Sequence, residues 1–335
     1  MKIWRKVLIG LIGVLLVGGA TYFFFRPYNH ASDSGNISGI SVPNSNSGKS
    51  SVSSSSGANG SVNPNKIQPV THIFIIMDEN QPASLITGNS PNDPYLSGLI
   101  KQYSLATNYF GVTHPSLPNY LAITSGSTDN TTTDCNPPSA GCIVNVKNIA
   151  DTVQASGRTW KEYAESMPSN CYAYNYGNYA TKHNPFVYYA DIINNKARCA
   201  ANVVPFSQLQ GNLSSVKTTP DFAFITPNLC NDMHNCSINT GDYWLSQVVP
   251  MILHSPAFTT QRSLLFITWD EGDATNNNVA TIVAGSAAKQ GYTSNMFFDH
   301  YSILSTIESL WNLPPLTQND KSATPMLDFI KPTGN

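Results

Sequence analysis

Three short apolar segments, each followed at once by acidic and amide side chains, constrain this chain more than any other feature of its sequence. The segments are His72–Asp78, Asp221–Thr226 and Ser263–Trp269. Apolar runs of this length are typical of strands that are buried in a parallel sheet. Because binding sites in open α/β sheets form beyond the carboxyl ends of the strands, we expect the polar clusters to meet at one edge of a sheet.

Helical patterns separate the predicted strands. They cover Leu117–Ser125, Asn148–Ala155, Tyr243–Leu253 and Ser302–Trp311, and Asn278–Gly285 is a fourth apolar run. Strands that alternate with helices predict an α/β sandwich with a mainly parallel central sheet.

The first 30 residues are predicted to be an export segment. Three basic residues among the first six precede an uncharged stretch, Val7–Phe25. As a helix this stretch would span roughly 28 Å, close to the ~30 Å hydrocarbon core of a bilayer. The basic flank predicts that the N-terminus stays in the cytoplasm and the rest lies outside. Gly18-Gly19-Ala20 also fits a signal-peptide cleavage site, but apolar residues continue past it, so we favour a retained anchor over residues 1–30.

A low-complexity segment and a long folded region follow. Residues 31–66 are dominated by Ser, Asn and Gly. This composition has too little apolar surface to offset its ordering entropy, so we expect a disordered linker. Residues 67–335 should form one large domain, or at most two, with an ample core. The net charge is −2 and only 11% of residues are charged, which argues against a nucleic acid-binding surface.

The six cysteines form an even set, as expected of an exported protein. The sequence has no Cys-x-x-Cys pattern, so structural bridges are favoured over a metal cluster. Two pairs are close in the sequence and the third pair remains. The predicted disulfides are Cys135–Cys142, Cys171–Cys199 and Cys230–Cys236.

Two pairs of oxygen-bearing residues stand at equivalent strand ends. Glu79-Asn80 follows the first strand and Asp270-Glu271 follows the third. Neighbouring side chains in a strand point to opposite faces, so both members of a pair reach one ion only where the chain turns off the strand. Their hard oxygen ligands suit Mg²⁺, Ca²⁺ or Mn²⁺ rather than a thiolate zinc site. Each pair alone would also suit a capping role, but two pairs at equivalent positions favour a metal site.

Ser116 opens one of the helical patterns. With Pro118 in the first turn, Ser116 is predicted to be the N-cap. A hydroxyl there lies beside free backbone N–H groups and the positive end of the helix dipole, where a phosphoryl group binds favourably. A plain capping serine has the same pattern, and the nearby His114 and Asn119 do not decide between the two.

The loop after the second strand presents Asp232 and His234 between the cysteines of the third predicted disulfide. His234 would stabilise phosphoryl oxygens or protonate a leaving group. The alternative is that His234 is a surface residue without a catalytic role. His183, in the segment Lys182–Phe186, and His300 are weaker candidates.

Five motifs occur in order across about residues 72–313. They are Ile75-Ile76-Met77-Asp78-Glu79-Asn80, His114-Pro115-Ser116-Leu117-Pro118-Asn119-Tyr120, Lys182-His183-Asn184-Pro185-Phe186, Thr226-Pro227-Asn228 with Asn231-Asp232-Met233-His234, and Thr268-Trp269-Asp270-Glu271-Gly272-Asp273. Together they resemble the phosphoesterase family of bacterial acid phosphatases and phospholipases C.

This resemblance implies a three-layer α/β/α sandwich of the alkaline-phosphatase-like superfamily, with a nucleophile at a helix start. It also implies a double displacement, in which a serine attacks phosphorus and water hydrolyses the phosphoserine. Carried over by motif, Glu79, Asn80, Asp270 and Glu271 would hold the metal, Ser116 would be the nucleophile, His234, His183 and Asp232 would surround the phosphate, and His114 and Asn119 would bind substrate.

We expect an extracytoplasmic, acid-phosphatase-like phosphomonoesterase that acts on a small phosphorylated substrate. A phospholipase C-like phosphodiesterase and a non-catalytic surface binding protein are the alternatives. A basic residue with Ser-Phe often follows Glu-Asn in the family, whereas this chain has Gln81-Pro82-Ala83-Ser84. Through its N-terminal helix the protein would be anchored at the cell surface, and it would be secreted if that segment is cleaved.

Overall fold

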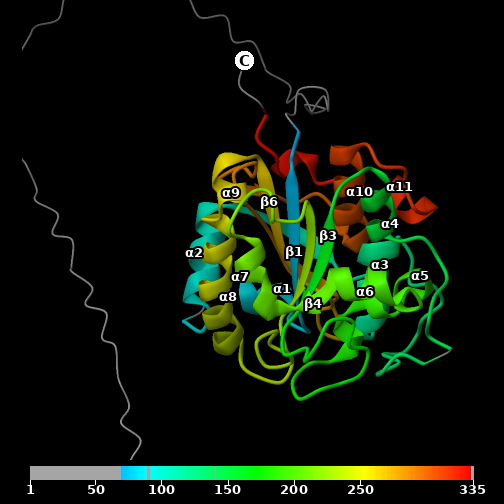
Figure 1. The fold of residues 1–335 in the computed structure, drawn as a ribbon. Helices are drawn as coiled ribbons and strands as arrows, with labels where there is room; N and C mark the ends of the chain where they lie inside the picture. The colour runs from blue at the N-terminus through cyan, green and yellow to red at the C-terminus, as the bar shows by residue number, and fades with distance from the viewer. Residues whose placement is uncertain (1–68, 89–90, 140, 333–335) are drawn as a thin grey trace, which may run out of the picture. The chain divides into compact units, whose positions relative to one another are not determined.

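β1 (His72–Asp78) lies in the middle of the sheet, and all of its residues are buried (Figure 1). In this computed structural model residues 69–88, 91–139 and 141–332 are described, and they hold one sheet of nine strands. β1 pairs in parallel with β5 (Phe222–Thr226) and with β6 (Ser263–Trp269). The three predicted strands are therefore adjacent, and their carboxyl ends meet at one edge of the sheet.

The remaining strands extend the sheet on both sides of this centre, in the order β4-β3-β5-β1-β6-β7-β2-β8, with β9 paired to β2. β7 (Asn278–Ala284), the fourth predicted strand, is antiparallel to both of its neighbours, whereas the other pairs are parallel. The strands without a prediction are β2 (Ser104–Phe110), β3 (Trp160–Ala164), β4 (Val203–Pro205), β8 (Tyr292–Ser294) and β9 (Phe298–Asp299).

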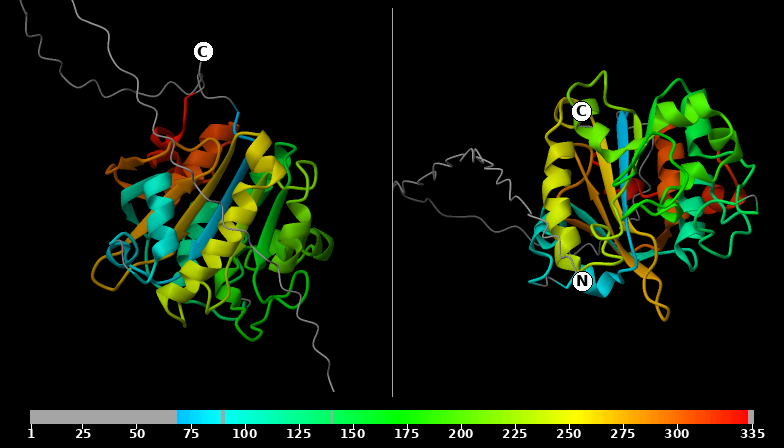
Figure 2. Two further views of the ribbon diagram at one scale, coloured as in Figure 1. Left: turned by 90° about the vertical axis from the view of Figure 1, so that its left-hand side faces the viewer. Right: turned by 60° about the horizontal axis from the view of Figure 1, so that its bottom comes forward.

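Helices cover both faces of the sheet, which confirms the three-layer α/β/α sandwich (Figures 1 and 2). One face carries α2 (Pro94–Gln102), α8 (Ile238–Leu253) and α9 (Pro256–Thr260), and the other carries α3 (Ser116–Ser125), α4 (Ile149–Ala155) and α10 (His300–Trp311). The short helices are α1 (Ala83–Ile86), α5 (Ala190–Ile193), α6 (Lys196–Asn202), α7 (Leu209–Asn212) and α11 (Gln318–Ser322), with 3₁₀ turns η2 (Thr181–His183), η3 (Pro185–Val187), η4 (Phe206–Gln208) and η5 (Leu327–Phe329).

Local capping explains several helix boundaries. Asn148 accepts a hydrogen bond from the Ala150 N–H at the start of α4, and Asp299 does the same for Ser302 in α10. α8 begins earlier than predicted because Ser237 caps it by accepting from Thr240 N–H. α3 ends at Ser125, and the next residue, Gly126, has a φ of 77°, which suits glycine; a Cβ there would lie 2.2 Å from Asp320 Oδ1.

The three disulfides have the predicted connectivity: Cys135–Cys142, Cys171–Cys199 and Cys230–Cys236. The predicted N-terminal anchor (1–30) and linker (31–66) lie outside the described residues. Within the described ranges, none of the helices combines the length and apolar character needed to cross a membrane.

Candidate active site

Ser116 is the first residue of α3, and Pro115 occupies the N-cap position. The predicted capping role of Ser116 is therefore wrong: its Oγ donates to Glu79 Oε2 at 3.0 Å instead. The backbone N–H of Leu117 donates at 3.3 Å to Asp134 Oδ1, so a carboxylate from the loop after α3 occupies the helix start. This arrangement leaves the buried Ser116 hydroxyl directed at the carboxyl ends of the strands.

Glu79 contacts the nucleophile candidate and two further side chains. Its Oε1 accepts a short hydrogen bond from the Tyr120 hydroxyl and lies 3.2 Å from His183 Nε2. Burial alone would raise the pKa of Glu79, but His183 and Tyr120 lower it overall. Sequence reasoning missed Tyr120, although its position four residues after Ser116 places both side chains on one face of α3.

The two predicted metal-ligand pairs come together where β1 and β6 end. The Asn80 backbone N–H donates to Asp270 Oδ1 at 3.0 Å, and Asn80 Nδ2 donates to Glu271 Oε1 at 2.8 Å. Asn80 has a φ of 46°, a conformation that asparagine tolerates well, so the chain turns off the strand there as the prediction requires. His114 Nδ1 forms a short contact with Glu271 Oε2.

A divalent metal fits this group of residues. Asn80 Oδ1 and Asp270 Oδ2 are buried and lack a hydrogen-bond partner among the described residues. Such orphaned oxygens are costly unless a donor or a cation satisfies them. Burial and the nearby Glu79 and Glu271 raise the pKa of Asp270 well above its usual value, which shows how crowded the negative charge is.

A second possible ligand group shares Glu79 with the first. Single ligand atoms of Glu79, His183 and His234 lie within 4.8 Å of one another. His183, however, also has its Nδ1 3.2 Å from Asp232 Oδ2, so carboxylates flank both of its nitrogens. Burial disfavours the imidazolium, yet Glu79 and Asp232 outweigh burial and raise the pKa of His183 to about 9. A protonated imidazole has no lone pair for a metal.

The loop after β5 directs Asp232 inward and His234 outward. Asp232 Oδ1 accepts from the His234 backbone N–H at 2.8 Å, and Met233 between them has a φ of 74°. A positive φ is strained for a residue such as methionine. Gly241 on α8 makes room for this turn, because a Cβ there would lie 2.5 Å from Met233 Cε. His234 is thereby exposed while Asp232 is buried.

Lys182 and Asp134 stand beside His234. Lys182 Nζ lies 3.0 Å from Asp134 Oδ2 and 3.4 Å from His234 Nε2. Burial would lower the pKa of Lys182, but Glu79 and Asp134 raise it overall. Lys182 belongs to one of the five sequence motifs, whereas Asp134 lies in none of them.

Two further predicted residues turn out to position the site. All polar atoms of the Asn119 side chain bond the backbone: Oδ1 accepts from Val112 and Thr113 N–H, and Nδ2 donates to the Thr113 and Pro115 carbonyls. Asn119 thus fixes the loop that leads into α3 and has no amide group left for a substrate. His300, a weaker candidate, contacts the Asp270 carbonyl through Nε2 at 2.6 Å. Burial lowers the pKa of His300 to about 4, so the neutral ring donates to that carbonyl.

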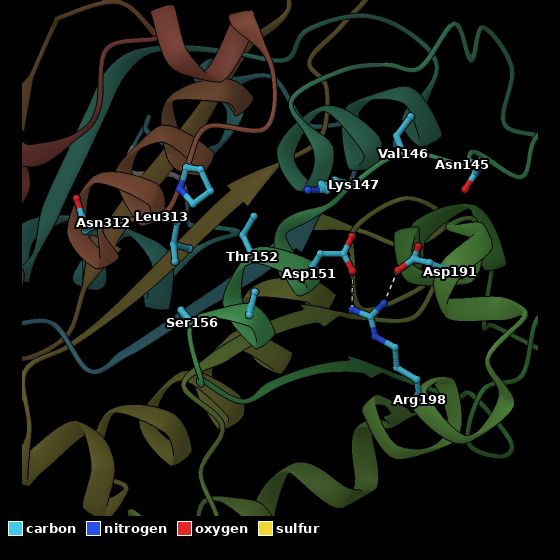
Figure 3. Close-up of a pocket in the computed structure, with 12 residues that line it drawn as sticks. Asn145, Val146, Lys147, Asp151, Thr152, Ser156, Asp191, Arg198, Asn312 and Leu313 are labelled. Carbon is cyan, nitrogen blue, oxygen red and sulfur yellow. Dashed lines mark hydrogen bonds and ion pairs between the residues drawn. The ribbon is translucent and has the colours of Figure 1, made fainter.

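A cavity of about 800 Å³ opens between α4, α6 and the loop after α10 (Figure 3). In it Arg198 lies between Asp151 and Asp191 and pairs with both. Of the described residues that line this cavity, none belongs to the predicted site. The chemistry is therefore expected at the strand ends and not in this cavity.

Comparison with known proteins identifies the family of this site. A profile of the Phosphoesterase family matches residues 89–314, which cover most of the described chain. The chain belongs to the phosphoesterase family. As a member it is a hydrolase that acts on phosphoric esters.

Several relatives have phosphatase names. The chain is 32% identical over 267 residues to a phosphatidylinositol-3-phosphatase of Mycobacterium tuberculosis, covering 77% of this chain and 82% of that one. It is 33% identical over 265 residues to a probable acid phosphatase of Kluyveromyces lactis, covering 75% and 60%. It is 32% identical over 279 residues to a phosphate-repressible acid phosphatase of Penicillium chrysogenum, covering 78% and 63%. The chain thus spans less than two thirds of the length of these fungal relatives.

Solved structures show the same fold at low sequence identity. A protein in the alkaline phosphatase superfamily from Vibrio parahaemolyticus matches with a TM-score of 0.57 and 12% identity, over 80% of this chain and 71% of that one. A lipoteichoic acid synthase from Listeria monocytogenes matches with a TM-score of 0.51 and 8% identity, over 76% of each chain. The expected alkaline-phosphatase-like architecture is confirmed.

Proposed function

We propose that this protein is an acid-phosphatase-like phosphomonoesterase that works through a Ser116 phosphoenzyme and a divalent metal. The observation that supports this most is the position of the Ser116 hydroxyl. It is buried at the start of α3, 3.0 Å from Glu79 Oε2, and it has no capping task. The unpartnered oxygens of Asn80 and Asp270 belong to the same group of side chains.

The proposed metal ligands are Glu79, Asn80, Asp270 and Glu271, and the proposed ion is Mg²⁺, Ca²⁺ or Mn²⁺. This oxygen set includes the orphaned oxygens of Asn80 and Asp270, which lie outside the alternative set of Glu79, His183 and His234. A divalent cation bound there would lower the pKa of the serine hydroxyl and neutralise charge on the phosphoryl group.

The residues of the chain divide the remaining work. Ser116 Oγ forms a bond to phosphorus while the ester P–O bond breaks, and the Glu79 carboxylate that accepts its hydrogen bond is in place to hold the proton. His234, which is exposed beside the site, gives a proton to the leaving oxygen. Water then attacks the phosphoserine and gives a proton to His234, the P–Oγ bond breaks, and Ser116 recovers its proton from Glu79. Asp232 and His183, both buried behind Glu79, orient that carboxylate.

We also propose that the protein acts outside the cytoplasm. Three disulfides are typical of proteins that fold in an oxidising compartment. The apolar N-terminal segment agrees with export, as a retained anchor or as a cleaved signal. The name of the mycobacterial relative describes a monoester carried on a lipid, so both soluble and lipid-borne monoesters fall within the proposed substrate class.

Ser116→Ala tests the nucleophile. We expect kcat for p-nitrophenyl phosphate to fall by more than about 1,000-fold, because no other hydroxyl replaces the nucleophile. The lost hydrogen bond to a charged group should cost only about 1.5–3 kcal/mol of stability, so the variant should stay folded. The control is Ser125→Ala, another buried serine of α3, whose Oγ donates to the Leu121 carbonyl.

Acid quenching with labelled substrate adds a direct readout. Phosphoserine should be recovered at position 116 from the wild-type protein and from Ser125→Ala, but not from Ser116→Ala. A Ser116→Ala protein that keeps more than a tenth of wild-type kcat would show that the nucleophile is another residue.

A further inference from the structure

We propose that Lys182 selects phosphate monoesters over diesters by binding the additional charged oxygen of a monoester, and that Asp134 positions it. This inference rests on the proposed function, but it concerns a side chain with no assigned role in that mechanism. The proposal starts from the place of the Lys182 ammonium group in the site.

Lys182 is a cation that is held inside the site and not on the surface. Its side chain is 11% exposed, and it lies on η2 directly before His183. Lysine is rarely buried to this extent unless it is paired. Its Nζ lies 3.0 Å from Asp134 Oδ2 and 3.4 Å from His234 Nε2, the proposed proton donor to the leaving group. The ammonium group therefore adjoins a residue that contacts the ester.

The Asp134 carboxylate connects this ammonium group to the nucleophile helix. Its Oδ2 accepts from Lys182, and its Oδ1 accepts from the backbone N–H of Leu117, the residue after Ser116. One carboxylate thus fixes Lys182 relative to the start of α3. An ammonium group has three N–H donors; Asp134 accepts one and His234 Nε2 lies within reach of a second, so at least one remains for a substrate.

Charge balance explains why a cation is required here. The proposed ligands bring three carboxylates, from Glu79, Asp270 and Glu271, and a divalent cation offsets only two of their charges. His183 is flanked by two carboxylates, Glu79 and Asp232, whereas Lys182 is paired with one, Asp134, so the positive charge of Lys182 is the less fully offset. A phosphate monoester brings up to two charges on three non-bridging oxygens, whereas a diester brings one charge on two. Lys182 therefore favours the monoester, whose third oxygen it can bind.

A purely structural role for the same ion pair predicts a different outcome. In that case Lys182 and Asp134 would only tie the loop after α3 to η2. Loss of the pair would then lower stability and would weaken the hydrolysis of every phosphate ester by the same factor. The ratio of kcat/KM for a monoester and a diester that share a leaving group distinguishes the two roles.

The test compares kcat/KM for p-nitrophenyl phosphate and methyl p-nitrophenyl phosphate with the full chain. For Lys182→Gln we expect the monoester value to fall about 100-fold and the diester value by less than about threefold. Lys182→Arg should retain most of the preference, because it keeps the charge. Asp134→Asn should reduce the preference by about tenfold, since it leaves the ammonium group without its anchor. The control is Lys217→Gln, an exposed lysine before the amino end of β5.

Equal losses for the two esters in Lys182→Gln would overturn the proposal, and so would an unchanged ratio with a lower melting temperature. If the wild-type protein hydrolyses neither ester, the proposed function fails, and calorimetric binding decides the role of Lys182. Lys182→Gln should then weaken the binding of inorganic phosphate at least about tenfold and leave the binding of dimethyl phosphate unchanged. An equal change for both anions would refute the inference independently of activity.

Discussion

Asp270→Asn should stabilise the protein in the absence of a divalent cation and lose most of that advantage when the cation is bound. Asp270 is fully buried, and Glu79 and Glu271 add to the burial that raises its pKa. In the presence of a chelator, a neutral amide relieves this repulsion, and we expect a gain of about 1–2 kcal/mol. At 2–4 °C per kcal/mol for a domain of this size, the melting temperature should rise by about 2–8 °C.

With a saturating cation this advantage of the variant largely disappears. A ligand at 100 times its dissociation constant stabilises the native state by about 2.7 kcal/mol, which corresponds to about 5–11 °C in the wild-type protein. The variant loses a charged ligand whose Oδ2 has no other partner, so its affinity should fall at least about tenfold. The cation-dependent stabilisation should then shrink by about 1.4 kcal/mol.

Differential scanning calorimetry with EDTA, Mg²⁺, Ca²⁺ or Mn²⁺ measures both effects. Glu162→Gln is the matched control, because Glu162 is also fully buried and burial raises its pKa well above its usual value, but it bonds Thr226 outside the proposed ligand set. Glu162→Gln should keep the full cation-dependent rise. If the cation raises the melting temperature of Asp270→Asn as much as that of the wild-type protein, the ligand assignment is refuted.

Three further predictions concern stability, the disulfides and the substrate. Burial and Asp320 raise the pKa of Glu308 to about 8. Between pH 4.5 and pH 8 the native state therefore keeps a proton that the unfolded chain has lost. The free energy of unfolding should fall as pH rises through this range. Glu308→Gln should match wild type at pH 4.5 and exceed it above pH 8 by about 2 kcal/mol after solvent screening, as measured by urea unfolding, and identical pH profiles would contradict this. Joint replacement of Cys230 and Cys236 by Ser should lower the free energy of unfolding by about 2 kcal/mol, because the disulfide closes a short loop. It should also lower kcat, because the turn that presents His234 loosens. An unchanged kcat would show that the disulfide does not position the site. Small aryl phosphates should be cleaved faster than phosphatidylcholine vesicles, with an optimum below pH 7, and faster lipid cleavage or activity that rises steadily above pH 8 would favour the phospholipase alternative.

The centre of the fold and the edge that holds the site could be predicted because their signals are local. The residues of β1, β5 and β6 are buried on both faces, so each strand is a continuous apolar run. β3 gave no such signal, because Trp160–Ala164 contains Lys161 and the buried Glu162. Edge strands such as β8 are too short for a recognisable pattern.

The parts of the site that escaped prediction depend on contacts between distant segments. Asp134 pairs with Lys182 across 48 residues, and only the folded loop brings it to the start of α3. The same contact explains the wrong capping prediction for Ser116, since another carboxylate holds the Leu117 N–H. Tyr120, by contrast, lay within reach of a periodicity argument, because it stands one turn from Ser116 on α3.

The central place of β1 determines when the protein can fold. β1 is the first strand of the described chain, yet its two neighbours are β5 and β6, and its Ile73 pairs with Phe222 on one side and Leu264 on the other. A growing chain therefore has no partner for either edge of β1 until residues far downstream have been synthesised. Such long-range pairing is slow, and it leaves an apolar strand exposed in every shorter fragment. A chain truncated before Ser263 lacks one edge of its core, so folding and assembly of the site both wait for the last third of the sequence.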